Sequence, residues 1–185
     1  MVTIASLWLP ILLSAVAVFI ASSIIHMFLG YHSADYGKLA AEDEFMAAVR
    51  KLDIPPGDYM VPSPTSHAAF KDPAFQQKLK AGPRAIMTVM GGDIGMGKQL
   101  FQWFLYCVLI GITAAYISGR ALGPGAHYLK VFRFAGATAF YGYTLAGLQQ
   151  SIWYKRSWGT TLRNTLDGLI YALLTAGFFG WLWPR

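Results

Sequence analysis

Four long apolar stretches, almost free of charge, constrain the fold of this chain more than any other feature. They cover residues 7–28, 100–118, 134–152 and 166–183. At about 1.5 Å of rise per residue, a helix over each stretch is long enough to cross a hydrocarbon core of about 30 Å. The sequence therefore predicts an all-α integral membrane protein with four transmembrane helices, forming a single membrane domain over residues 1–185.

The composition supports the same prediction. Charged residues make up 13% of the chain, against about 25% in soluble domains. Tryptophan prefers the membrane–water interface, and all six tryptophans lie at or just beyond the ends of the four stretches: Trp8, Trp103, Trp153, Trp158, Trp181 and Trp183. The single cysteine, Cys107, excludes an internal disulfide framework.

Four spans would place both termini on one side of the membrane, and the basic residues indicate which side. Lys and Arg are more numerous in the connections after the first and third stretches than in the other loops. The positive-inside rule then predicts a cytoplasmic insertion at residues 31–99 and both termini outside, in a bacterial inner membrane. Lys155, Arg156 and Arg163 are expected to contact anionic lipid headgroups. Nothing in the sequence indicates nucleic-acid binding.

The roughly 70-residue insertion between the first two spans, residues 31–99, is predicted to contain two short helices. One covers residues 40–52 and ends before a Pro-Pro-Gly sequence. The second begins after an N-cap at Asp72, with Pro73 in its first position, and ends at Gly82. Two helices of this size cannot enclose a core of their own. We therefore expect the insertion to lie against the bundle or another protein, not to form an independent domain.

The stretch GGDIGMGKQL, residues 91–100, nearly matches the nucleotide-binding motif G-x-x-x-x-G-K-[ST]. Gln99 replaces the hydroxyl residue that would hold Mg²⁺, and the helix that would follow is the second transmembrane span. The sequence therefore predicts no nucleotide binding. It favours a glycine-rich approach to the membrane, with Lys98 at the boundary.

One pattern in the fourth span concerns helix packing. Gly168, Ala172, Ala176 and Gly180 recur every four residues and form a stripe of small side chains. Such stripes let helices approach closely in lipid. The partner is expected to be another span of this chain or another subunit.

His26, His32 and Asp167 are the candidates for binding a ligand or handling protons, because ionisable groups near spans are often functional. His26 and His32 belong to the sequence HMFLGYHSAD, which ends at Asp35. On a continuous helix the two imidazoles would lie about 240° apart, so one metal ion would reach both only if Gly30 broke the helix. The sequence therefore predicts no metal site. Axial ligation of haem or chlorophyll by His26 is a further hypothesis.

Asp167 has two interpretations. A carboxylate in the first turn of a span interacts favourably with the helix N-terminus. Alternatively, Asp167 pairs with Arg163 or with His26, and a His–Asp pair at the membrane face would relay protons or hold a polar ligand.

Two functions follow from these features. The first is a non-catalytic accessory or structural subunit of a larger membrane complex, for example a respiratory or photosynthetic one, because no set of nucleophile, base and orienting group is evident. Its partners would be lipid and other membrane subunits or further copies of itself. The alternative is a small transporter, channel or membrane enzyme that uses the polar residues at the cytoplasmic face, including a version with haem or pigment on His26.

Overall fold

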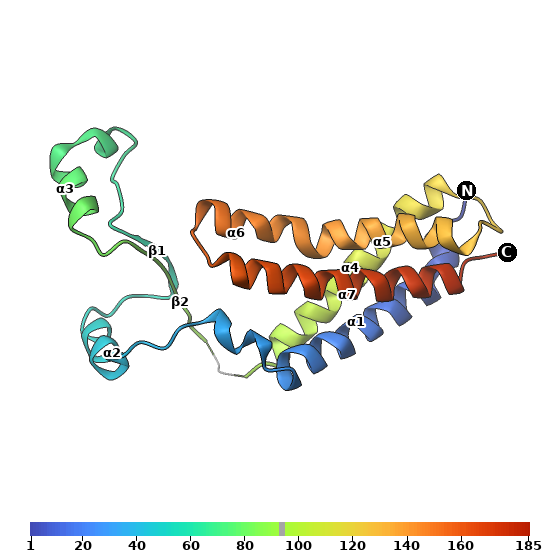
Figure 1. Ribbon diagram of the computed structural model, residues 1–185, viewed down its shortest axis with the longest axis horizontal. Coiled ribbons are helices and arrows are strands. Elements are labelled where there is room, and N and C mark those ends of the chain that lie inside the picture. Colours follow the sequence, from blue (N-terminus) through green and yellow to red (C-terminus); the bar gives the residue numbers. More distant parts are fainter. Residues whose placement is uncertain (93–94) are drawn as a thin grey trace. The chain divides into compact units, whose positions relative to one another are not determined.

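The computed structural model describes residues 1–92 and 95–185, which form two compact units. The helical unit contains Met1–Gly37 and Gly95–Arg185, and the insertion unit is Lys38–Ile94. Helices dominate the described residues, and one two-stranded sheet lies in the insertion unit (Figure 1).

Five α-helices build the helical unit: α1 (Trp8–Phe28), α4 (Gly97–Ala121), α5 (Tyr128–Thr144), α6 (Leu148–Trp153) and α7 (Trp158–Trp181). Around the bundle, α1 contacts α4 and α7, and α5 also contacts α4 and α7. Both chain termini lie at one end of this unit (Figure 1), where the Val2 amide donates to the Gly119 carbonyl at 3.0 Å.

Two helices are long and apolar enough to cross a membrane, judged by length and composition. They are Ala5–Phe28, which joins the short 3₁₀ turn η1 (Ala5–Leu7) to α1, and α4. They correspond to the first two predicted spans. The fourth predicted span, residues 166–183, falls largely on α7, which begins earlier than expected, at Trp158, and so also includes Arg163.

The third predicted span is not one continuous helix. After α5 ends at Thr144, a 3₁₀ turn, η4 (Leu145–Gly147), leads into α6. The Thr144 hydroxyl donates to the Phe140 carbonyl at 2.6 Å, a contact that often bends helices. Gly147 also has a low helix propensity. These local effects interrupt a stretch whose hydropathy alone predicted an unbroken helix.

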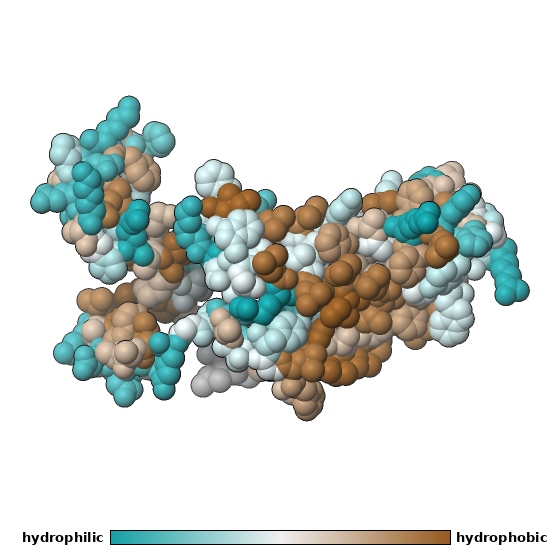
Figure 2. Space-filling model, in the orientation of Figure 1, coloured by the Kyte–Doolittle hydropathy of each residue, from teal (hydrophilic) through white to brown (hydrophobic). Residues whose placement is uncertain are grey.

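The outer surface of the helical unit is apolar, and its interior contains small and polar side chains. On α1, Ser14, Ala15 and Ser22 are buried, whereas Leu12 and Ile20 are exposed. In Figure 2, hydrophobic residues cover much of the visible middle of the unit. A helix at the surface of a soluble protein has the reverse distribution, with its polar face outward.

The small-residue stripe of α7 faces α5. Ala172 and Ala176 are buried, and a Cβ atom added to Gly136 of α5 would lie 3.0 Å from the Ala176 side chain. A Cβ atom at Gly180 would lie 2.6 Å from Tyr128, and one at Gly168 would collide with Thr144. The stripe therefore lets two helices of the same chain approach closely.

The insertion unit contains both predicted helices. They are α2 (Glu42–Arg50) and α3 (Pro73–Ala81), and the Asp72 side chain accepts from the Ala74 amide at 2.9 Å as the expected N-cap. A 3₁₀ turn, η3 (Ala68–Lys71), precedes α3. Phe75 on α3 is buried, with its ring centroid 5.7 Å from that of Phe70.

The insertion unit also requires a correction to the all-α prediction. Strands β1 (Gly57–Val61) and β2 (Ala85–Val89) pair antiparallel, with Gly57 opposite Val89 and Val61 opposite Ala85. Each segment reads as extended, but α3 lies between them along the chain. The pairing is therefore a long-range contact that no local sequence pattern reports.

Candidate functional site

A cluster of ionisable side chains lies where α1 ends and α7 begins. It draws on α1, on the 3₁₀ turn η2 (Tyr31–Asp35) and on the N-terminal part of α7. We call it the polar cluster, and its members are His26, Tyr31, His32, Asp35, Arg163 and Asp167.

The end of the helix α1 and the turn that follows it bring the two histidines of this cluster together. The helix ends at Phe28, and Leu29 and Gly30 connect it to η2. The imidazole rings of His26 and His32 then lie 4.4 Å apart between centroids. The separation of 240° expected for a continuous helix therefore does not apply, because α1 ends two residues before Gly30.

Asp167 is the central acceptor of the polar cluster, and its residue is only 3% exposed. Its Oδ1 accepts a hydrogen bond from the Tyr31 hydroxyl. Its Oδ2 lies 2.8 Å from His32 Nε2 and 3.9 Å from His26 Nε2. Burial, together with the hydrogen bond to Asp167, raises the pKa of Tyr31 to about 12. The hydroxyl therefore stays protonated and donates a hydrogen bond to the carboxylate.

Asp35 connects His32 to Arg163. Its Oδ2 lies 2.7 Å from His32 Nδ1, and its Oδ1 accepts from Arg163 Nε at 2.8 Å and lies 2.6 Å from Arg163 Nη2. Burial alone would raise the pKa of Asp35, but the hydrogen bonds from His32 and Arg163 outweigh it and hold that pKa below its ordinary value. Asp35 is therefore a carboxylate at neutral pH, fixed between an imidazole and a guanidinium.

The charges within the polar cluster do not balance when the imidazoles are neutral. The cluster then holds two carboxylates, Asp35 and Asp167, and one guanidinium. That guanidinium, of Arg163, pairs with Asp35. Among the described residues, the partners of Asp167 are Tyr31, His32 and His26. A buried carboxylate requires compensation by a positive charge or strong donors, and with neutral imidazoles a cation bound beside Asp167 would supply that charge.

Aromatic side chains lie one helical turn further into the bundle. Tyr171 follows Asp167 by one turn on α7, and its ring centroid lies 5.5 Å from that of Tyr143 and 6.0 Å from that of Trp103. Trp103 donates from Nε1 to the Ser22 hydroxyl at 2.8 Å, and Ser22 precedes His26 by one turn on α1. This aromatic layer separates the polar cluster from the apolar middle of the bundle.

The geometry bears on the reason for which the sequence predicted no metal site. One donor atom each from His26, His32 and Asp167 lies within 4.8 Å of the other two. The obstacle identified in the sequence, two imidazoles on different sides of a helix, is removed by the end of α1 at Phe28. For the haem hypothesis, the third histidine of the helical unit, His127, does not serve as a second axial ligand beside His26. It caps the start of α5 at the opposite end of the unit, where its Nδ1 accepts from the Leu129 amide at 3.2 Å.

The three basic residues predicted to contact lipid differ in their surroundings. Lys155 is exposed in the turn before α7. Arg156 lies over the Tyr36 ring, with 5.7 Å between its guanidinium carbon and the ring centroid. Arg163 turns toward Asp35 and is a member of the polar cluster.

Along the chain, the glycine-rich motif crosses the boundary between the two units, and two of its residues, Asp93 and Ile94, are outside the described residues. Gly97 and Lys98 begin α4. The strand before the motif, β2, belongs to an antiparallel pair, whereas a nucleotide-binding loop follows a strand of a parallel sheet.

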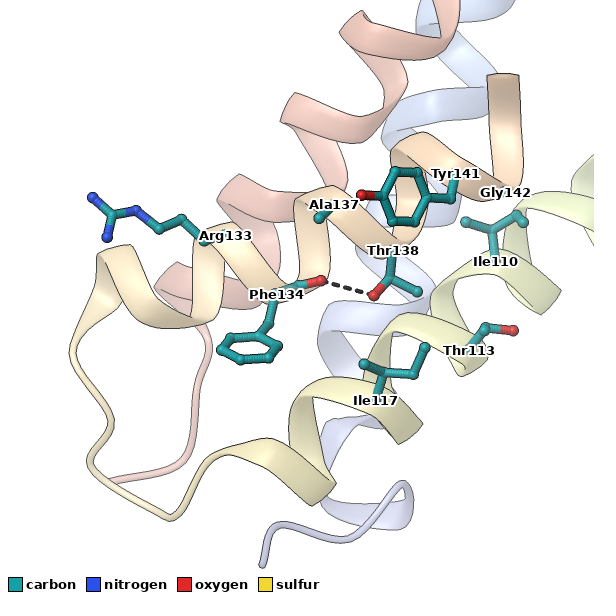
Figure 3. Close-up of a pocket in the computed structure, with 9 residues that line it drawn as sticks. All are labelled: Ile110, Thr113, Ile117, Arg133, Phe134, Ala137, Thr138, Tyr141 and Gly142. Atoms are coloured by element: carbon teal, nitrogen blue, oxygen red, sulfur yellow. Dashed lines mark hydrogen bonds between the residues drawn. The ribbon is translucent and has the colours of Figure 1, made fainter. Parts of the chain in front are cut away.

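An apolar groove of about 550 Å³ runs along the outside of the bundle between α4 and α5 (Figure 3). In that view Ile117, Phe134 and Thr138 point into the groove, while Arg133 extends away from it. The Thr138 hydroxyl donates to the Phe134 carbonyl at 2.8 Å, which leaves an apolar lining. Its residues are Ile110, Thr113, Ile117, Arg133, Phe134, Ala137, Thr138, Tyr141 and Gly142.

Comparison with protein families, with curated proteins and with solved structures found no match to this chain. Sequence reasoning named His26, His32 and Asp167 but overlooked Tyr31. The available signal was the compact sequence YHSAD directly after a glycine, which places four polar side chains within one short turn.

Proposed function

We propose that this chain is a four-span membrane protein that acts through its polar cluster, as a small transporter or membrane enzyme handling a cation at one membrane face. The spans are α1, α4, the segment from α5 through α6, and α7. The 24 residues of α7 correspond to about 36 Å at the usual helical rise. The exposed apolar surface of the bundle supports this assignment, because such a surface is unfavourable in contact with water but favourable in contact with lipid chains.

The observation that carries the functional part of the proposal is the environment of Asp167. This carboxylate is buried, its Oδ1 accepts from Tyr31, its Oδ2 lies 2.8 Å from His32 Nε2, and Arg163 is directed to Asp35 instead. A bound cation would compensate its charge. The side chain of His26 is exposed, so a cation in the solvent can reach the polar cluster at this residue.

Span number and orientation are tested with single cysteines in a Cys107→Ala background. Gly123→Cys lies between α4 and α5, and Ser157→Cys lies between α6 and α7. We expect a membrane-impermeant maleimide to label position 157 from the cytoplasmic side and position 123 from the outer side. Labelling of both positions from the same side would contradict the four-span arrangement.

The role of the polar cluster is tested by flux measurements in proteoliposomes that contain the full chain. We expect Asp167→Asn and His32→Gln to abolish proton or metal-ion flux, and His127→Asn, at the opposite end of the unit, to preserve it. If all three variants behave like the wild-type protein, the cluster is not the functional centre.

The groove between α4 and α5 favours a second candidate, an accessory subunit of a membrane complex. The groove is apolar and lies on the outside of the bundle, where a transmembrane helix of another chain would fit. Gentle extraction followed by identification of the co-purifying chains tests this function. Substitution of Ala137 by Leu would fill the groove and should release such a partner. Purification of the wild type as a single component would contradict it.

A further inference from the structure

We propose that His26, His32 and Asp167 bind one divalent transition-metal ion of the zinc class. Around a tetrahedral ion with bonds of about 2.0–2.1 Å, neighbouring donor atoms lie about 3.4 Å apart. The Asp167 Oδ2 atom lies 2.8 Å from His32 Nε2 and 3.9 Å from His26 Nε2. These distances bracket the required value, so small side-chain rotations bring all three donors to one ion. This inference names the cation in the proposed function and rests on that function for its biological role.

The donor set selects the class of metal. Two imidazole nitrogens and one carboxylate oxygen suit Zn²⁺ and its neighbours in the first transition row, whereas Ca²⁺ and Mg²⁺ prefer oxygen ligands. The double positive charge of the ion also compensates the buried Asp167 carboxylate, which lacks a guanidinium of its own among the described residues.

Groups around the three ligands hold them in orientation. His32 Nδ1 lies 2.7 Å from the Asp35 carboxylate, which Arg163 fixes from its other side. This contact directs Nε2 of His32 toward the proposed ion, as carboxylate–histidine pairs do at known metal sites. The Tyr31 hydroxyl engages Oδ1 of Asp167 and leaves Oδ2 for the metal. Asp35 and Tyr31 are thus positioning residues.

The site is open on the side of His26. The side chain of His26 is 52% exposed, compared with 13% for His32 and 4% for Asp167. Three protein ligands with an accessible fourth position are typical of zinc sites that bind water or substrate, whereas structural zinc sites have four protein ligands. The fourth ligand of this ion would therefore be water or a substrate atom.

Metal binding is measured on the full-length protein in detergent, after chelator treatment, by competing Zn²⁺ against a chromophoric chelator. We expect one Zn²⁺ per chain, and visible absorption when Co²⁺ replaces it. His26→Ala and His32→Ala should each lower affinity by more than about 100-fold, and Asp35→Asn by about 10–100-fold. His67→Ala and His127→Ala are the matched controls and should bind like the wild type.

Two outcomes would overturn the inference. One is the absence of stoichiometric Zn²⁺ binding by the wild-type protein, and the other is unchanged affinity in both His26→Ala and His32→Ala. His26→Ala should leave the fold intact, because this ring is exposed and makes no hydrogen bond within 3.5 Å among the described residues. A change in affinity in this variant therefore reports on metal binding itself. Cluster-dependent flux without bound metal would refute the metal and retain the proposed function. Bound metal without cluster-dependent flux would do the reverse.

Discussion

At the scale of single residues, Asp35 links the two parts of the polar cluster. It joins His32 on the 3₁₀ turn η2 to Arg163 on α7 through three short contacts. The turn is short and has no buried residue of its own. Its position against α7 is held by polar contacts of this kind, by the hydrogen bond from Tyr31 to Asp167 and by the packing of the Tyr31 ring against the core.

Replacing Asp35 with Asn should destabilise the folded protein by about 1–3 kcal/mol, because the partly buried guanidinium of Arg163 loses its charged partner. Thermal unfolding in detergent measures the effect. Asp43→Asn, an exposed position on α2, is the control and should leave the unfolding temperature unchanged. Equal unfolding temperatures for both variants would show that the Asp35–Arg163 pair does not hold η2 in place.

At the scale of elements, the packing of α5 on α7 depends on glycines that have no room for a side chain. A Cβ atom at Gly168 would collide with Thr144, but one at Gly177, on the same helix, would meet no atom within 4 Å. Small residues at such an interface allow the close approach that replaces the hydrophobic effect in lipid.

This difference predicts opposite effects for the same substitution. Gly177→Ala should stabilise the protein by about 0.5–1 kcal/mol, because alanine favours a helix over glycine. Gly168→Ala should destabilise it by about 1–3 kcal/mol through overpacking. Unfolding of both variants under identical detergent conditions measures the difference. A stabilising Gly168→Ala variant would contradict the close contact with Thr144.

At the scale of the whole molecule, the apolar exterior of the helical unit is the feature that bears on the proposed membrane location. Leu109 is 56% exposed in the middle of α4, whereas Leu100 lies near its start. In water, an exposed Leu→Lys change would be nearly neutral. In a bilayer, a lysine at the centre of a span costs about 2.5–3.5 kcal/mol.

We therefore expect Leu109→Lys to reduce the amount of protein in the membrane fraction strongly, and Leu100→Lys to have little effect, because its amine reaches the interface. Carbonate extraction followed by quantification measures both. Equal recovery of the two variants and the wild type would indicate that α4 does not cross a membrane.

Much of the secondary structure followed from local patterns. Hydropathy predicted the apolar helices, and capping chemistry at Asp72 and Pro73 predicted the start of α3. These features are local, because a helix depends on neighbouring residues and on the solvent around it. The interruption at Thr144 was missed, because hydropathy does not report how one hydroxyl bonds to its own backbone.

The polar cluster and the β1–β2 pair required the three-dimensional structure. The cluster unites Tyr31, His32 and Asp35 with Arg163 and Asp167, more than a hundred residues later. The sequence identified His26, His32 and Asp167 as candidates and offered His26 or Arg163 as the partner of Asp167, but it indicated neither the Tyr31 contact nor the pairing of Arg163 with Asp35. Those partners depend on where the chain turns after Phe28 and on which helix it then contacts. Both are set by packing between distant segments, which the order of residues along one segment does not specify.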